Sequence, residues 1–143
     1  MSVQQISVFL ENKCGRLAEV TKLLAKVGVN IRALSIADTS DFGILRLIVD
    51  KPDIAYQVLK ENDFTVSMTE VIAVEMPDIP GGLARVLEIL DKEKINLEYL
   101  YAFIGQSGCE AINIFRVEQI DEAVEVLEKH QIKVIPEVEV YSL

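Results

Sequence analysis

The sequence predicts an α+β protein in which one order of elements, βαββαβ, occurs twice. The chain repeats itself, because Gly15–Ile31 (GRLAEVTKLLAKVGVNI) aligns at a shift of 66 with Gly81–Leu97 (GGLARVLEILDKEKINL) and seven of these 17 positions are identical. Strand-like and helix-like periodicity follow in the same order in both copies, and no flexible spacer separates them. A length of 143 residues suits two small domains that pack together.

The elements of the first copy follow from the spacing of its apolar residues. Ile6, Val8 and Leu10 alternate with polar neighbours, as in a half-buried strand. Apolar residues then recur at helical spacing, and Gly28 suits the end of that helix. The expected elements are the strand Gln4–Glu11, a helix from Leu17 to Val27, the strands Asn30–Ala37 and Ile44–Val49 around a polar hairpin turn, the helix Pro52–Asn62 and the extended stretch Thr65–Met76.

The second copy repeats this order, and its first strand overlaps the last strand of the first copy, with a break expected near Thr69. Two such units are ferredoxin-like, with antiparallel sheets and helices on one face. We expect one domain at residues 1–69 and another at residues 70–143, docked edge to edge. The expected elements of the second copy are the strand Val71–Met76, the helix Gly81–Glu93, the strands Asn96–Phe103 and Ala111–Val117, the helix Asp121–Lys129 and the strand Lys133–Val140.

Charge and composition argue against several classes of protein. The 23 acidic residues outnumber the 14 basic ones and give a net charge of −9, whereas a nucleic-acid binder needs cations to neutralise phosphates. No apolar run approaches the roughly 20 residues that cross a bilayer, and we see no secretory signal, so we expect a cytoplasmic protein that does not contact membranes. Cys14 and Cys109 form no CxxC pair, which argues against a metal site, and no motif implies a cofactor.

The turn between the first strand and the first helix is the candidate site in each copy. The two turns, Glu11–Leu17 (ENKCGRL) and Pro77–Leu83 (PDIPGGL), share the pattern Asn/Asp-x-x-Gly-x-Leu. A glycine at the mouth of a helix lets the backbone approach a ligand, and the amide donors of the first helical turn favour a carboxylate. The side chain of Asn12 or Asp78 would accept a hydrogen bond from an ammonium group. These features together suit both ends of an α-amino acid.

Other interpretations of the same residues remain. Asn12, Asp78 and the two glycines also suit an ordinary turn, which shared ancestry would preserve. A phosphate-binding enzyme on this fold would use an arginine such as Arg16, but the second copy has Gly82 at the matching position, so the case for catalysis is weak.

An aromatic stripe on one expected strand also has more than one interpretation. Tyr99, Tyr101 and Phe103 alternate with Leu100 and Ala102, so they share one face of the strand. Because the chain is acidic, we expect this stripe to pack against helices or to form an interface rather than to stack on RNA bases.

Both copies are similar to ACT domains, and the similarity extends over nearly the whole chain. It rests on the two strand-to-helix turns described above and on the segments that follow the two helices, Gly28–Ile31 (GVNI) and Lys94–Leu97 (KINL). The usual phrase of the family, Asp-x-Pro-Gly-x-Leu, stands at Asp78–Leu83. The first copy departs from it, with Asn12 in place of the Asp and Cys14 in place of the Pro. These departures weaken the attraction for an ammonium group and loosen the loop, so the two sites would differ in affinity.

The resemblance implies a site for a free amino acid between the loop of one domain and the second strand of its neighbour. Copies packed edge to edge would form an eight-stranded sheet that holds two ligands, whereas pairing across chains would require a dimer. The implied binding residues are Asn12, Cys14, Gly15, Arg16 and Leu17 with the strand that begins at Asn96 and Leu97, and Asp78, Ile79, Pro80, Gly81, Gly82 and Leu83 with the strand that begins at Asn30 and Ile31.

The sequence therefore predicts a non-enzymatic regulatory protein that binds a free amino acid and acts on a metabolic enzyme or on its own assembly, as a homo-oligomer such as a dimer. The alternative is a structural or oligomerisation module that has lost ligand binding. The apolar residues around the turns hint at an uncharged ligand, with Ile79, Leu83, Leu17 and strand residues such as Leu34 or Tyr99 as its contacts.

Overall fold

The computed structural model describes residues 2–11, 13–38, 41–103 and 110–143. Seven strands and five helices lie within these ranges. They form two compact units, Gln4–Thr69 and Glu70–Leu143, the latter joined by the N-terminal residues up to Val3. We call them the N-terminal unit and the C-terminal unit. None of the helices in the described ranges is long and apolar enough to cross a membrane.

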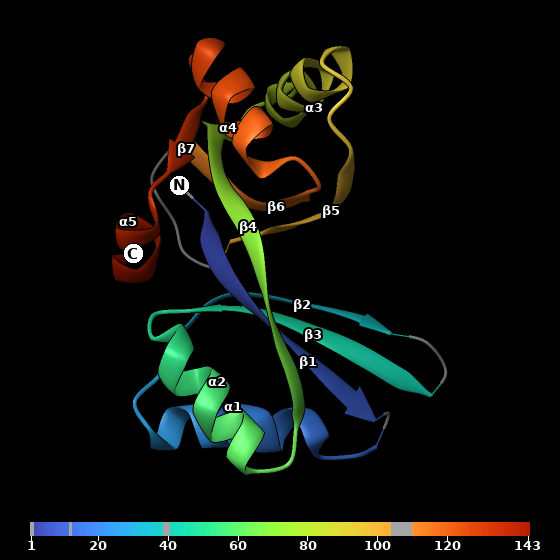
Figure 1. The fold of residues 1–143 in the computed structure, drawn as a ribbon, viewed down its shortest axis with the longest axis vertical. Coiled ribbons are helices and arrows are strands. Elements are labelled where there is room, and N and C mark those ends of the chain that lie inside the picture. The colour runs from blue at the N-terminus through green and yellow to red at the C-terminus, as the bar shows by residue number, and fades with distance from the viewer. Residues whose placement is uncertain (1, 12, 39–40, 104–109) are drawn as a thin grey trace. The chain divides into compact units, whose positions relative to one another are not determined.

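The N-terminal unit contains an antiparallel sheet with both of its helices on one face (Figure 1). Its strands follow the order β2-β3-β1-β4, and β3 pairs antiparallel with both β1 and β2. The core lies between this sheet and the helices, and Ile6, Leu24 and Leu59 within it are fully buried. Its elements are β1 (Val3–Glu11), α1 (Arg16–Lys26), β2 (Ile31–Asp38), β3 (Phe42–Val49), α2 (Pro52–Glu61) and the first part of β4 (Thr65–Pro77).

The C-terminal unit repeats this arrangement strand for strand. Its order is β7-β4-β6-β5, with antiparallel pairs throughout, which matches the order in the N-terminal unit. The prediction of two ferredoxin-like βαββαβ units is therefore confirmed. Besides the second part of β4, its elements are α3 (Gly82–Lys92), β5 (Leu97–Ala102), β6 (Glu110–Val117), α4 (Ile120–Lys129), β7 (Lys133–Ile135) and α5 (Glu137–Ser142).

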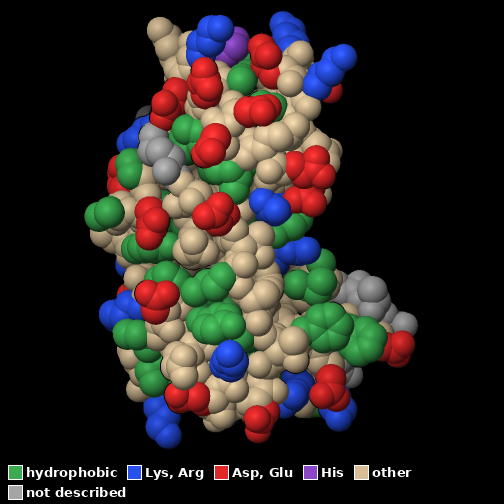
Figure 2. Space-filling model, in the orientation of Figure 1, with side chains coloured by type: hydrophobic (Ala, Val, Ile, Leu, Met, Phe, Trp, Pro, Cys, Tyr) green, Lys and Arg blue, Asp and Glu red, His purple; other side chains and the backbone are tan. Residues whose placement is uncertain are grey.

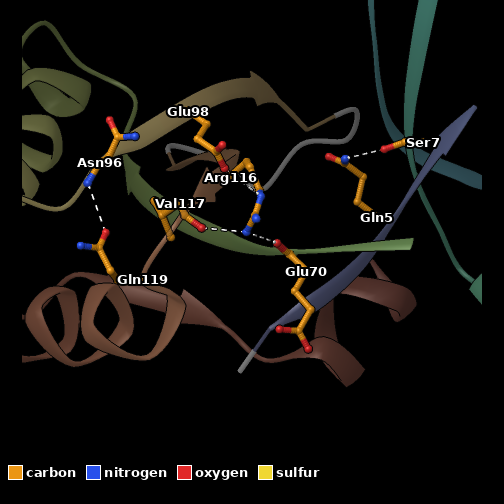
Figure 3. Close-up of polar contacts among 8 residues, drawn as sticks. All are labelled: Gln5, Ser7, Glu70, Asn96, Glu98, Arg116, Val117 and Gln119. Atoms are coloured by element: carbon orange, nitrogen blue, oxygen red, sulfur yellow. Dashed lines mark hydrogen bonds and ion pairs between the residues drawn. The ribbon is translucent and has the colours of Figure 1, made fainter. Parts of the chain in front are cut away.

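One arginine ties three strands of the C-terminal unit together (Figure 3). Arg116 on β6 donates from Nη1 to the backbone oxygens of Glu70 at 3.2 Å and of Val117 at 2.7 Å. Its Nε forms an ion pair with Glu98 on β5 at 3.0 Å. Arg116 thus has a structural role within this sheet.

Strand β4 runs from Thr65 to Pro77 without the break expected near Thr69. Its residues up to Thr69 belong to the N-terminal unit and the others to the C-terminal unit. No glycine or proline precedes Pro77 in the stretch TVSMTEVIAVEMP, and β-branched residues favour extended backbone, so nothing in it stops the strand.

The end of the chain differs from the expected strand Lys133–Val140. Strand β7 stops at Ile135, and the short helix α5 begins after Pro136. Pro136 has no N–H to donate to a sheet, and its φ of −63° and ψ of 150° suit the residue before a helix. Glu137 and Glu139 in the first turn favour this helix through its dipole.

The tyrosines of the aromatic stripe on β5 lie on the sheet face away from α3 and α4. Tyr99 pairs with Arg116 and Tyr101 with Ile114, whereas Leu100 pairs with the core residue Phe115. Side chains alternate along a strand, so the two tyrosines lie on the sheet face opposite α3 and α4. Their rings stack with centroids 6.5 Å apart. The alternation was predicted correctly, and the two tyrosines do not pack against α3 or α4.

All four long helices end in the same way, although their sequences differ there. In α1 and α3 the amide of Val29 donates to Leu24 O at 2.9 Å and the amide of Ile95 donates to Leu90 O at 3.0 Å. The preceding residue has a left-handed backbone in each case, Gly28 with φ 74° and Lys94 with φ 57°. This is the Schellman arrangement, in which glycine avoids the strain that a Cβ brings.

We therefore expect opposite effects from exchanging these residues. Lys94→Gly should stabilise the protein, and Gly28→Ala should destabilise it, each by about 1 kcal/mol. An added Cβ at Gly28 would meet nothing within 4 Å, so the change tests backbone strain alone. Urea unfolding followed by circular dichroism measures both variants. A loss of stability in Lys94→Gly would contradict this account of the helix ends.

Candidate functional site

The two predicted turns adopt the same backbone conformation. Gly15 and Gly81 each have φ 87° and ψ −7° and stand directly before α1 and α3. An added Cβ at either position would meet nothing within 4 Å, so glycine is needed there for its left-handed backbone rather than for space. No side chain in the described part of the chain caps either helix. The start of each helix therefore stays open toward its turn. We call these two turns the elbows.

The residue after each glycine makes the two elbows different. A Cβ added at Gly82 would lie 2.2 Å from the backbone oxygen of Pro77, which no side chain tolerates. The amide of Gly82 donates to Ile79 O at 3.0 Å, whereas the amide of Arg16 donates to Lys13 O at 3.4 Å. The C-terminal elbow is thus closed over a buried glycine. The N-terminal elbow has room for an arginine at the matching position.

A hollow of about 230 Å³ opens beside the N-terminal elbow, entirely within the N-terminal unit. We call it the elbow pocket. The pairing of β1 with β3 places Phe42 opposite Glu11 and Gly43 opposite Leu10, so the end of β1 and the start of β3 form one wall. The first turn of α1 and the strand β2 form the rest. Its lining residues are Leu10, Glu11, Lys13, Arg16, Leu17, Ile36, Phe42 and Gly43.

The charged side chains of the elbow pocket contact one another. The Nζ of Lys13 lies 2.8 Å from Oε2 of Glu11, and Nη2 of Arg16 lies 3.7 Å from Oε1 of the same carboxylate. The hydrogen bond and the charge of Lys13 lower the pKa of Glu11 below its usual value of 4.5, and Arg16 contributes in the same direction. Glu11 is therefore a carboxylate at neutral pH and through mild acid.

Arg16 is held in place from two sides. Its Nη1 lies 3.0 Å from Oε2 of Glu19, one helical turn ahead. Its Cζ lies 4.9 Å from the ring centroid of the buried Phe64, a cation–π geometry. Its Nε is buried and has no hydrogen-bond partner within the described residues. The guanidinium group is thus held in one orientation, and not all of its N–H donors have a hydrogen-bond acceptor among these residues.

The net charge of the chain lies in the C-terminal unit. Residues 4–69 carry eight acidic and eight basic side chains, whereas residues 70–143 carry fifteen and six. Figure 2 shows acidic side chains gathered over the C-terminal unit. An anionic group therefore meets less repulsion at the N-terminal unit.

The structure brings the predicted loop residues of each unit together, and it places the predicted strand residues away from the elbow of the same unit. The exposed Cys14 and the residues Gly15, Arg16 and Leu17 form the N-terminal elbow, and residues 78–83 form the C-terminal one. Asn12 lies outside the described residues. The predicted strand residues lie at the far end of their own unit from its elbow, as the register of β3 and β6 requires: Asn30, Ile31, Asn96 and Leu97.

The backbone amides that begin these two strands are already bound. The amide of Asn30 donates to Oδ1 of Asp50 at 2.8 Å. The amide of Asn96 donates to Oε1 of Gln119 at 3.4 Å (Figure 3). These hydrogen bonds hold the backbone before each strand and use no atom of either asparagine side chain.

Sequence reasoning missed most of the pocket wall. No sequence pattern marked Leu10, Ile36 or Phe42 as pocket residues, because strand pairing alone brings them to the elbow. Glu11 and Lys13 stood inside the quoted turn, and their opposite charges two residues apart were the one available sign.

A comparison with protein families identifies the fold. The family model of the ACT domain pair matches residues 1–143. The chain belongs to the ACT domain pair family. Both ferredoxin-like units are therefore ACT units, and the predicted resemblance is confirmed. No curated protein matches the sequence.

Solved structures agree with this assignment. Protein BT0572 from Bacteroides thetaiotaomicron is 43% identical, with a TM-score of 0.94 over 100% of this chain and 98% of that one. The regulatory subunit of aspartate kinase from Thermus thermophilus, in a ligand-free form, is 15% identical, with a TM-score of 0.64 over 88% and 91%. The aspartokinase alpha and beta subunits are 16% identical, with a TM-score of 0.60 over 88% and 90%. At these low identities the two kinase structures share the ACT fold.

The closed C-terminal elbow predicts that Gly82 tolerates no side chain. Gly82→Ala should destabilise the protein by about 1–3 kcal/mol, because its Cβ would press on the backbone of Pro77. Ala84→Ser, an exposed change in the same helical turn, should cost less than about 0.5 kcal/mol. Urea unfolding measures both. Equal midpoints for the two variants would contradict the closed elbow.

The ion pair at the N-terminal elbow predicts how Glu11 titrates. The pKa of its carboxyl group, followed by NMR, should lie below 4.5 in the unaltered protein and rise toward that value in Lys13→Gln. A carboxylate with a lowered pKa contributes stability above its unfolded pKa, and this contribution disappears as the pH falls through the folded value. Lys22→Gln, which removes another cation of α1, is the control. An unchanged pKa for Glu11 in Lys13→Gln would contradict the assigned cause.

Proposed function

We propose that this ACT pair is a regulatory protein that binds a free amino acid as its effector and passes the binding signal to a partner enzyme or to its own assembly. The observation that carries this proposal is the elbow pocket, where a carboxylate, two cations and an apolar wall line one hollow of about 230 Å³. Pockets for drug-sized ligands span about 300–1,000 Å³, so this one suits a small metabolite.

The chemistry of the elbow matches both ends of an α-amino acid. An ammonium group needs an ionised acceptor, and Glu11 is one. A carboxylate needs donors or positive charge, and Arg16, Lys13 and the open start of α1 supply them. A left-handed glycine brings the backbone close to the ligand without a Cβ in the way.

The proposal extends to the loop residues predicted from the sequence. In the N-terminal unit they are Asn12, Cys14, Gly15, Arg16 and Leu17. The C-terminal elbow, with Asp78, Ile79, Pro80, Gly81, Gly82 and Leu83, would be a second and different site, because it has no cation at the positions of Lys13 and Arg16. The pairing of each elbow with the strands that begin at Asn30 and Asn96 stays a prediction.

We also propose that the chain regulates rather than catalyses, and that it acts in the cytoplasm. It would do so either as a homo-oligomer, such as a dimer, or in complex with a metabolic enzyme. The Thermus thermophilus chain of the same fold is a regulatory subunit, which supports this proposal by analogy. Two ACT units joined in one chain suit such a role because a ligand shifts the population of conformations that a partner sees. The two domains proposed for this role are residues 1–69 and 70–143.

Calorimetric titration of the full chain with each of the twenty amino acids tests the function. We expect heat from at least one of them at or below millimolar concentration. The double variant Gly15→Ala and Gly81→Ala should weaken this binding while circular dichroism still reports the native fold, because a Cβ strains the left-handed backbone that precedes each helix. A folded protein that binds none of the twenty would support the alternative, a purely structural or oligomerisation module.

A further inference from the structure

Resting on the proposed function, we infer that the elbow pocket of the N-terminal unit selects an α-amino acid with an uncharged, apolar side chain. In this arrangement the ligand carboxylate binds Arg16, the ligand ammonium group binds Glu11, and the side chain lies against the apolar wall of the pocket. The inference depends on three features of the lining. The guanidinium of Arg16 has N–H donors without a hydrogen-bond acceptor among the described residues, one oxygen of the Glu11 carboxylate accepts no short hydrogen bond there, and a group of apolar side chains is exposed.

The guanidinium of Arg16 has donors left for a carboxylate. It carries five N–H donors in a planar fork. Nη1 pairs with Glu19 at 3.0 Å, but the contact from Nη2 to Glu11 is 3.7 Å, which is too long for a hydrogen bond. The ring of Phe64 holds the guanidinium plane from one side. A ligand carboxylate therefore meets a donor that is already oriented, and its hydrogen bonds are charge-assisted.

Glu11 complements Arg16 at the right distance for a zwitterion. Its Oε2 accepts the hydrogen bond from Lys13 at 2.8 Å, which keeps the carboxyl group ionised. Its Oε1 has the long contact to Arg16. An amino acid that binds alongside this pair places its ammonium group on Glu11 and its carboxylate on Arg16, so it adds two short contacts beside the long one. The protein keeps its charge balance, because the ligand has no net charge.

Apart from Lys13, whose ammonium group already pairs with Glu11, the rest of the pocket offers no partner for a charged side chain. Leu17 is 38% exposed, Ile36 45% and Phe42 46%, and all three line the same hollow with Leu10. Large apolar side chains exposed together mark a binding surface. A second charge on the ligand would lose its hydration against them without gaining a partner. Aliphatic or aromatic side chains gain instead, because they cover these residues.

The C-terminal elbow does not offer the same chemistry. The positions that match Glu11, Lys13 and Arg16 hold Pro77, Ile79 and Gly82. None of these residues carries a charge, and Gly82 has no room for a side chain. The pairing of a ligand zwitterion with an arginine and a glutamate is therefore specific to the N-terminal unit.

A ligand series tests the selectivity on the full chain. Calorimetric titration compares leucine and phenylalanine with aspartate and lysine, and leucine with leucinamide, which keeps the ammonium group but lacks the carboxylate. We expect the apolar pair to bind at least about tenfold more tightly than the charged pair. Leucinamide should bind at least about tenfold more weakly than leucine, because it leaves Arg16 without its partner.

Variants then assign the contacts. Arg16→Gln should weaken the affinity for leucine by about tenfold or more. It should leave the weak binding of leucinamide unchanged, because leucinamide has no carboxylate to bind the guanidinium. Glu11→Gln should weaken both ligands, because both have the ammonium group. Lys22→Gln removes an exposed cation of α1 outside the pocket and should leave leucine binding unchanged. Circular dichroism of each variant establishes that it is folded.

The possible failures are distinct. Tighter binding of aspartate or lysine than of leucine and phenylalanine would overturn the inference and leave the proposed function standing. If Arg16→Gln lowered the affinity for leucine and for leucinamide by the same factor, the role of Arg16 as the carboxylate partner would be overturned. Binding of no amino acid at all would overturn the inference and the proposed function together.

Discussion

Each unit depends on one backbone constraint, the left-handed conformation of the glycine before its first helix. Gly15 and Gly81 share the same φ and ψ, so the chain leaves the first strand and enters the helix along the same path in both copies. A side chain would strain this path. Because no described side chain caps the helices, strand end and helix start face a common space. What fills that space is decided by the neighbouring residues, and these differ between the copies.

Most of the fold could be predicted from the spacing of apolar residues. The four long helices and the central strands begin and end within a residue or two of their expected positions, because each spans enough turns or alternations to show its period. The C-terminus could not be predicted in this way. Pro136, Val138 and Val140 alternate with Glu137 and Glu139 as in a strand, and a helix of six residues is too short to show a period of its own.

The candidate site was predictable in its centre and not in its walls. The internal repeat located both elbows, since the glycine and the leucine recur at a constant shift. The register of β1 on β3 then brings Phe42 and Gly43 to the elbow, and no spacing along the chain encodes that register. The sequence did not show why the C-terminal elbow has a second glycine. Gly82 is required by the backbone of Pro77, whatever the elbow binds.

The uninterrupted strand β4 has an evolutionary consequence. Strand β4 (Thr65–Pro77) belongs to both units. A recombination event at the unit boundary would therefore leave each half of the protein ending within a strand rather than in a loop. Modules joined by a loop can be separated without dividing an element, whereas separating these two copies at their boundary divides a strand. A strand shared in this way couples the ends of two copies whose elbows differ in charge, so a change at one elbow remains covalently linked to the other through extended backbone.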